Sequence, residues 1–240
     1  MQQSGRLKDS IDFLMWSYFN LTLGDGDRLD RILGTCVERA YSDATQQGAY
    51  NTSIPKDDID LKKASADAKT AGGKELMKRI LMLLEGKAEA FNIWHEKTCG
   101  AVKGAYEKVR RNGAGLFSYG NAQKWVNMSL KYIYSLYWLY QAFSPECLFC
   151  KTCGSAIEKY AGEFHAPADS FIIEALELKN VRAWSKWDES EYSRYQELLK
   201  GTIPSDKSQL EWEGSSWINV AKSRKTKDFR ELEARYKRKN

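Results

Sequence analysis

Residues 119–141 read YGNAQKWVNMSLKYIYSLYWLYQ, and the second half of this segment is apolar on almost every side. In a globular protein, a helix of that composition is buried all round. Its most apolar run, 132–140, is far shorter than the ~20 residues that a membrane-crossing helix needs. We therefore expect an all-α protein, a compact multi-helix bundle around this central aromatic-rich helix, with no membrane partner.

Most of the remaining chain carries apolar residues at helical spacing. In the clearest case, Leu29, Leu33, Val37 and Ala40 follow one face of a helix predicted over 28–40. Further helices are predicted over 10–23, 74–111 with a break near 99–100, 167–178, 189–200, 208–221 and 227–237. Segment 56–73 is either a solvent-facing helix or mobile, and no segment has a persuasive strand pattern.

Composition indicates a folded domain with a sizeable core. The 240 residues are 42% hydrophobic and include 8 Trp, 13 Tyr and 9 Phe, whereas disordered chains are poor in aromatic residues. We expect a single helical domain over 1–221, with 112–118 and 143–166 as candidate points of subdivision, followed by a basic C-terminal helix over 222–240.

The positive charge is concentrated near the C-terminus. Residues 218–240 hold nine Lys or Arg and three Asp or Glu, a balance of +6, so the rest of the chain carries −1 of the overall +5. Such a tail attracts polyanions, including nucleic acid, with an affinity that falls steeply with salt. A solvated terminal helix is equally compatible with this pattern.

The cysteines and the N-terminal residues favour a cytoplasmic location. Five cysteines is an odd number, and residues 1–9 are polar, without the apolar run of a secretory signal. We therefore expect reduced thiols and no disulfide framework.

Three polar residues of the central helix, Gln123, Asn127 and Lys131, are four apart and share one face, with Lys124 beside them. The surrounding rings include Tyr119 and Tyr134. If this face lines a cavity, two carboxamides and an ammonium between rings can hold a base edge and a phosphate. The alternative is that the polar stripe is the solvated face of the helix.

The residues from Phe117 to Lys124, followed by Asn127 and Lys131-Tyr132, form a GxAQKxxNxxxKY-like pattern. This pattern resembles a helix of uncharacterised bacterial and phage hypothetical proteins. The resemblance covers about fifteen residues and implies a microbial or phage origin, with bacterial defence as one context. It implies no activity.

Aromatic and basic residues also alternate in the last third of the chain. Trp184 and Trp187 are interleaved with Arg182 and Lys186, a combination that can stack on bases and contact phosphates. Most of these rings are also compatible with an ordinary core.

If the protein is an enzyme, the candidate catalytic residues are His165, Asp169, Glu177 and Lys179. His165, which is also a candidate ligand-binding residue, precedes a predicted helix N-terminus, where an acid or base can meet an anion. The order of Asp169, Glu177 and Lys179 loosely matches a Mg²⁺-dependent nuclease, in which two carboxylates hold the metal. Capping of the helix that follows explains Asp169 without any chemistry.

Cys147, Cys150 and Cys153 have C-x2-C-x2-C spacing, which is compatible with a zinc site. The second half of a strong zinc pattern is missing, and the alternative is three thiols in a loop after the central helix. We therefore favour no cofactor.

These patterns lead to three hypotheses. The first is a non-catalytic binding protein for an anionic, base-bearing ligand, either a nucleotide messenger or a short nucleic acid. The second is a nuclease or nucleotide-processing enzyme. The third is a helical interaction or scaffold protein, which a homo-oligomer would suit.

Overall fold

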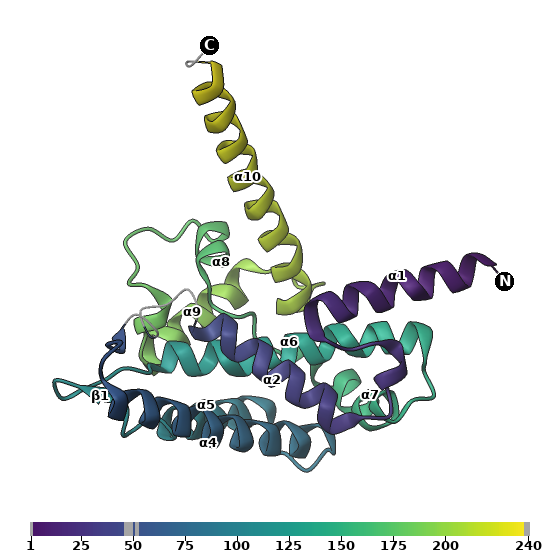
Figure 1. Cartoon of the computed structure of the whole chain (residues 1–240), viewed down its shortest axis with the longest axis horizontal. Helices are drawn as coiled ribbons and strands as arrows, with labels where there is room; N and C mark the ends of the chain where they lie inside the picture. The colour runs from purple at the N-terminus through teal and green to yellow at the C-terminus, as the bar shows by residue number, and fades with distance from the viewer. Residues whose placement is uncertain (1, 46–49, 51–52, 238–240) are drawn as a thin grey trace.

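The computed structural model describes residues 2–45, 50 and 53–237, and it confirms the all-α class (Figure 1). The α-helices are α1 (Gln2–Phe19), α2 (Leu29–Thr45), α4 (Ile59–Leu84), α5 (Phe91–Gly104), α6 (Tyr119–Phe143), α7 (Leu148–Tyr160), α8 (Ser170–Ala175), α9 (Glu189–Thr202) and α10 (Gln209–Lys237). Short 3-10 turns are η1 (Leu23–Asp25), η2 (Ala161–Glu163) and η3 (Trp184–Lys186). No helix within these described residues is long and apolar enough to cross a membrane.

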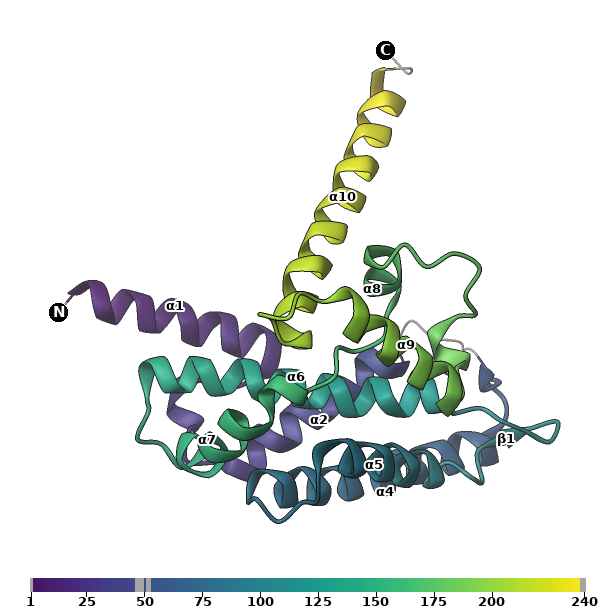
Figure 2. The same cartoon turned by 180° about the vertical axis from the view of Figure 1, so that it is seen from behind.

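The predicted central helix is α6, and α2, α5, α7 and α9 surround it (Figures 1 and 2). Every residue from 119 to 130 is buried, whereas Trp138 is 50% exposed. The expectation that the second half is buried all round is therefore wrong. The small and polar residues of the first half let neighbouring helices approach closely. The first half is also tied to α2, because Trp125 donates from Nε1 to the Val37 carbonyl at 2.8 Å.

One turn of chain lies directly on the N-terminus of α6. The Gly120 amide donates to the Trp187 carbonyl at 3.0 Å, and the Ser118 hydroxyl donates to the Ser185 carbonyl at 2.8 Å. A Cβ atom on Gly120 would lie 1.8 Å from the Trp184 carbonyl oxygen. Only glycine therefore permits η3 to approach α6 this closely.

The predicted helix over 74–111 is instead parts of two helices. Residues 59–73 of the segment 56–73 form the whole first half of α4, which passes through Gly72 and ends at Leu84. A Cβ atom on Gly72 would lie 3.1 Å from the Trp125 ring, so glycine lets α4 lie close to α6. The chain reverses at Gly86, whose φ is +70°, and α5 continues through the predicted break at 99–100.

Two short strands follow α5, although no strand was expected. β1 (Arg110–Arg111) pairs with β2 (Ala114–Gly115) in an antiparallel hairpin. Asn112 and Gly113 connect them with φ values of 50° and 79°, the left-handed geometry that a tight two-residue hairpin requires.

The two terminal helices project from the bundle (Figures 1 and 2). α1 begins earlier and ends earlier than the predicted 10–23 helix. The predicted helices 208–221 and 227–237 are one continuous helix, α10, so the boundary placed at residue 222 falls inside it. The predicted 167–178 helix is the shorter α8, which packs against α10.

We predict that Gly120→Ala destabilises the fold, because the new methyl group overlaps the Trp184 carbonyl unless η3 moves. Overpacking of this kind costs at least ~1–3 kcal/mol in the free energy of unfolding. Gly100→Ala is the matched control, since its Cβ would meet no atom within 4 Å and alanine favours a helix. Urea unfolding measures both variants, and equal midpoints for Gly120→Ala and the parent protein would contradict the close approach.

Candidate binding cleft

A cleft of about 770 Å³ separates α6 from α8 and α10. One wall consists of α6 residues together with the end of α1, and the other consists of α8, segment 181–185 and one residue of α10. The lining residues that carry charge or a large ring are Tyr18, Phe19, Asp43, Lys124, Lys131, Tyr132, Asp169, Phe171, Arg182, Trp184 and Trp217. Of the nine ligand-binding residues that the sequence suggested, Lys124, Lys131 and Trp184 line this cleft.

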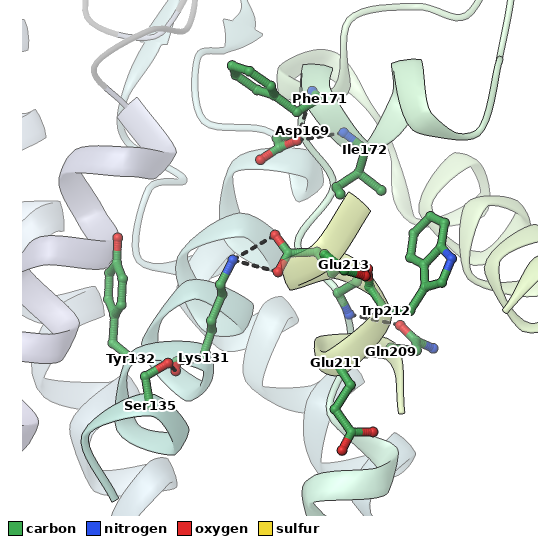
Figure 3. Close-up of polar contacts among 12 residues, drawn as sticks. Lys131, Tyr132, Ser135, Asp169, Phe171, Ile172, Gln209, Glu211, Trp212 and Glu213 are labelled. Carbon is green, nitrogen blue, oxygen red and sulfur yellow. Dashed lines mark hydrogen bonds and ion pairs between the residues drawn. The ribbon is translucent and has the colours of Figure 1, made fainter. Parts of the chain in front are cut away.

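Lys131 joins α6 to α10 beside the cleft. Its Nζ lies 2.7 and 2.5 Å from the two carboxylate oxygens of Glu213 (Figure 3). Glu213 is 1% exposed, whereas the Lys131 side chain is 26% exposed. A carboxylate buried this deeply needs a charged partner, so this ion pair fixes the first turns of α10 against α6.

Lys124 makes a second ion pair across the same cleft. Its Nζ lies 3.0 Å from Oδ2 of Asp169, and it stands 5.7 Å from the centre of the Trp184 ring. The other oxygen of Asp169 accepts from the backbone amides of Phe171 and Ile172 at 2.9 Å, which caps α8. Burial would raise the pKa of Asp169, but the Lys124 ammonium and the α8 amide hold it below its usual value. Asp169 is therefore a charged helix cap, as the capping interpretation predicted.

Aromatic rings border the cleft on the side of α8 and α10. The Phe171 and Trp217 rings lie 4.7 Å apart at 31°, and the Arg224 guanidinium lies 4.1 Å from the Phe171 ring centre. Trp217 keeps 37% of its surface exposed. A flat ligand can therefore reach an indole face in the cleft.

The opposite wall carries a chain of hydroxyl groups. The Tyr132 hydroxyl donates to Asp43 and lies 2.7 Å from the Tyr18 hydroxyl. Burial and the nearby Asp43 carboxylate raise the pKa of Tyr132, so this phenol stays protonated. Asp43 and Glu213 were missed in the sequence because each pairs with α6 from a distant segment.

The two carboxamides of the polar stripe do not line the cleft. Gln123 and Asn127 are fully buried on the face of α6 toward α5 and α9. The Asn127 amide nitrogen donates to Gln123 Oε1 at 3.0 Å and to the Tyr192 hydroxyl at 2.8 Å. Asn127 Oδ1 therefore accepts from His95 Nε2, at 2.7 Å. The stripe is split between an interior hydrogen-bond network and the cleft.

Both histidines of the chain belong to this interior network. The His95 and His165 rings lie 4.4 Å apart, and His165 Nδ1 lies 2.9 Å from the Tyr192 hydroxyl. Burial lowers the pKa of His95 to about 4, and the hydrogen bond that His95 donates to Asn127 opposes this shift. Burial, and then the neighbouring His95 and Lys200, lower the pKa of His165 well below its usual value. Both rings are therefore neutral at physiological pH.

Three further candidate ligand residues pack in the protein rather than in the cleft. Tyr119 lies against the Tyr192 ring at 5.8 Å, and Tyr134 lies against Trp138 at 6.2 Å. Trp187 is buried and donates from Nε1 to the Arg182 carbonyl at 2.8 Å. The core interpretation fits Trp187, whereas Tyr134 is half-buried beside the 50% exposed Trp138.

The four candidate catalytic residues lie in different places. His165 lines a separate pocket with Lys200, and Asp169 lines the cleft. α8 ends before Glu177 and Lys179, which are both exposed. This arrangement does not reproduce the paired carboxylates of a Mg²⁺-dependent nuclease.

Two of the three closely spaced cysteines lie inside α7, so the expected loop is wrong for Cys150 and Cys153 and holds only for Cys147. Cys147 is the N-cap residue of α7, and Cys150 and Cys153 are buried inside the helix. Burial, with a contribution from Cys147, raises the pKa of Cys150 to about 12. Among the residues with described positions, no group of three or more His, Cys, Asp or Glu side chains could hold a metal ion.

Comparison of this chain with protein-family models, with curated proteins and with solved structures found no match.

We predict that Tyr192→Phe destabilises the protein by about 2–4 kcal/mol, because buried donors on Asn127 and Gln196 and the His165 nitrogen lose their partner. Tyr195→Phe is the matched control on the same helix. Its hydroxyl is buried without a described partner, so its removal leaves stability unchanged or raises it. Urea unfolding of the two variants gives the comparison, and equal losses would refute the network.

Proposed function

We propose that this protein is a non-catalytic binding protein that captures an anionic, base-bearing ligand in the cleft between α6 and α8–α10. The observation that carries the proposal is the presence of two ammonium groups and accessible indole rings in one cleft of about 770 Å³. That volume falls within the range of small-molecule sites. The ligand is either a nucleotide messenger or a short nucleic acid.

The lysines of the cleft have hydrogen-bond donors left for a phosphate. An ammonium group has three N–H donors. Lys131, whose side chain is 26% exposed, uses two of them for Glu213, and Lys124, whose side chain is 6% exposed, uses one for Asp169. Because each lysine already has a carboxylate partner, the cleft is not strongly positive. Stacking on Trp184 or Trp217 must therefore supply a large part of the affinity, which favours a mononucleotide or dinucleotide over a long polyanion.

Features outside the cleft suit the same kind of ligand. The basic residues of α10 are a second contact for a polyanionic partner, because residues 218–240 carry a balance of +6. A cytoplasmic location suits the five free thiols. A role in bacterial or phage defence fits a nucleotide messenger as the ligand.

One observation favours the alternative of an interaction or scaffold protein. The projecting helix α1 exposes large apolar side chains, with Phe13 69%, Leu14 62% and Trp16 53% exposed. Apolar groups that gather on one helix mark protein contacts, and a homo-oligomer would cover them. A monomeric mass in solution would count against this alternative.

Thermal unfolding with mono-, di- and cyclic nucleotides and single-stranded oligonucleotides tests the cleft. At a ligand concentration of 100 times Kd, we expect stabilisation of about 2.7 kcal/mol. Trp217→Ala should weaken binding roughly 5- to 150-fold, because stacking on one base is worth ~1–3 kcal/mol. Trp138→Ala is the control, since this 50% exposed ring does not line the cleft.

Two results would remove the proposal. One is that no ligand in the panel stabilises the protein. The other is that Trp138→Ala weakens binding as much as Trp217→Ala.

A further inference from the structure

His165 opens onto a second pocket, of about 270 Å³, that is distinct from the cleft. It lies where α9 ends and α10 begins, and η2 and one residue of α5 complete it. The lining residues are Asn92, Gly162, Glu163, His165, Lys200, Ile203, Pro204, Ser205, Lys207 and Gln209. None of them lines the cleft, so the two sites are separate.

The interior network determines which nitrogen of His165 carries the proton. The Tyr192 hydroxyl oxygen accepts from Asn127 at 2.8 Å and from Gln196 at 3.0 Å, which fills both of its lone pairs. With the Gln196 amide nitrogen toward Tyr192 and Gln196 Oε1 buried without a described partner, the single hydrogen of Tyr192 goes to His165 Nδ1. Because burial keeps the ring neutral, its proton sits on Nε2.

The Nε2–H group of His165 is the inner donor of this pocket. Nδ1 points inward to Tyr192, so Nε2 lies on the other side of a ring that is only 8% exposed. Across the described part of the chain, no residue accepts a hydrogen bond from Nε2. A donor held here by the core can bind acceptor oxygens, either of water or of a ligand, and a protonated nitrogen cannot bind a metal ion.

The charges around this donor favour an anion. Lys200 and Lys207 are exposed, and neither forms an ion pair with any residue described in the structure. α10 begins at Gln209, which lines the pocket, and the start of this 29-residue helix carries a partial positive charge. The Glu211 amide is already capped there by the Ser208 hydroxyl at 3.3 Å, and the Glu211 carboxylate accepts from Ser208 at 2.8 Å. Glu163, an exposed residue, is the one carboxylate among the lining residues.

We propose that this pocket is a binding site for a small oxyanion of the phosphate or phosphomonoester class. His165 Nε2–H, Lys200 and Lys207 are the donors, beside the positive end of α10. The small volume excludes the large apolar part of a drug-sized ligand, for which sites of ~300–1,000 Å³ are usual. This inference does not depend on ligand binding in the cleft.

Histidine side-chain NMR on the full chain tests the site, with inorganic phosphate as the first probe and glycerol phosphate as the second. We expect the ¹⁵N spectrum to show His165 protonated at Nε2. Phosphate should shift the Nε2 signal saturably at millimolar concentration, at constant ionic strength set with chloride. Saturation by phosphate alone identifies a free-ion site, and saturation by both probes extends it to phosphomonoesters.

Charge variants at exposed positions test the ligand contacts without disturbing the core. Lys200→Gln should weaken phosphate binding about 5- to 10-fold, a loss typical of one solvent-exposed hydrogen bond. Glu163→Gln should strengthen it several-fold, and Lys8→Gln, on α1, should change nothing. His165 protonated at Nδ1, a shift that does not saturate, or an equal effect of Lys8→Gln and Lys200→Gln would each overturn the proposal.

Discussion

The side-chain amide of Asn127 is the point at which three helices are joined inside the core. It bonds His95 of α5, Gln123 of α6 and Tyr192 of α9, and it has no exposed surface. Leaving a buried polar group unpaired costs about 1–3 kcal/mol, so these partners must stay in register. The network therefore fixes how α6 is rotated relative to α5 and α9.

The rotation of α6 also places the lysines. With about 100° of turn per residue, Lys124 and Lys131 lie roughly 60° and 40° from Asn127 around the helix axis. When Asn127 faces the core, both ammonium groups lie at its edge, where Asp169 and Glu213 can reach them. The rotation of α6 therefore determines both the core network and the cleft. The two ion pairs connect α8 and α10 to α6 at the edge of the core, and the cleft lies there.

Part of the fold follows from local sequence. The central helix could be predicted because its apolar residues are dense and Ser118 and Asn121 cap its start. The reversal at Gly86 could not, because that glycine resembles Gly72, Gly100 and Gly104, which are helical. Of these four glycines, only Gly86 has a positive φ. That backbone conformation depends on the packing of α5 against α4.

The candidate site shows the same limit. Spacing correctly placed Gln123, Asn127 and Lys131 on one side of α6, but it could not assign their partners. His95 and Tyr192, which bond Asn127, are 32 and 65 positions from it in the chain, and Glu213 is 82 positions from Lys131. A polar residue bonded inside a core and one that awaits a ligand have the same local pattern, and only tertiary contacts separate them.

The dependence of stability on pH tests the buried network most directly. Burial lowers the pKa of His95 from 6.5 to about 4 and lowers that of His165 well below 6.5. Below about pH 6.5 the unfolded chain therefore binds protons that the folded protein does not. The contribution of the two histidines to the free energy of unfolding is complete above that pH and is lost as the pH falls. The lowered carboxylate pKa values of Asp25 and Asp169 act below pH 3.8, outside this range.

Urea unfolding at pH 7 and at pH 5.5 is the decisive measurement. Two neutral, buried histidines predict that the free energy of unfolding falls by about 1 kcal/mol for each of them between these values. Equal stability at the two pH values, or greater stability at pH 5.5, would show that the imidazoles are solvated or charged in the folded protein and would contradict the network around Asn127.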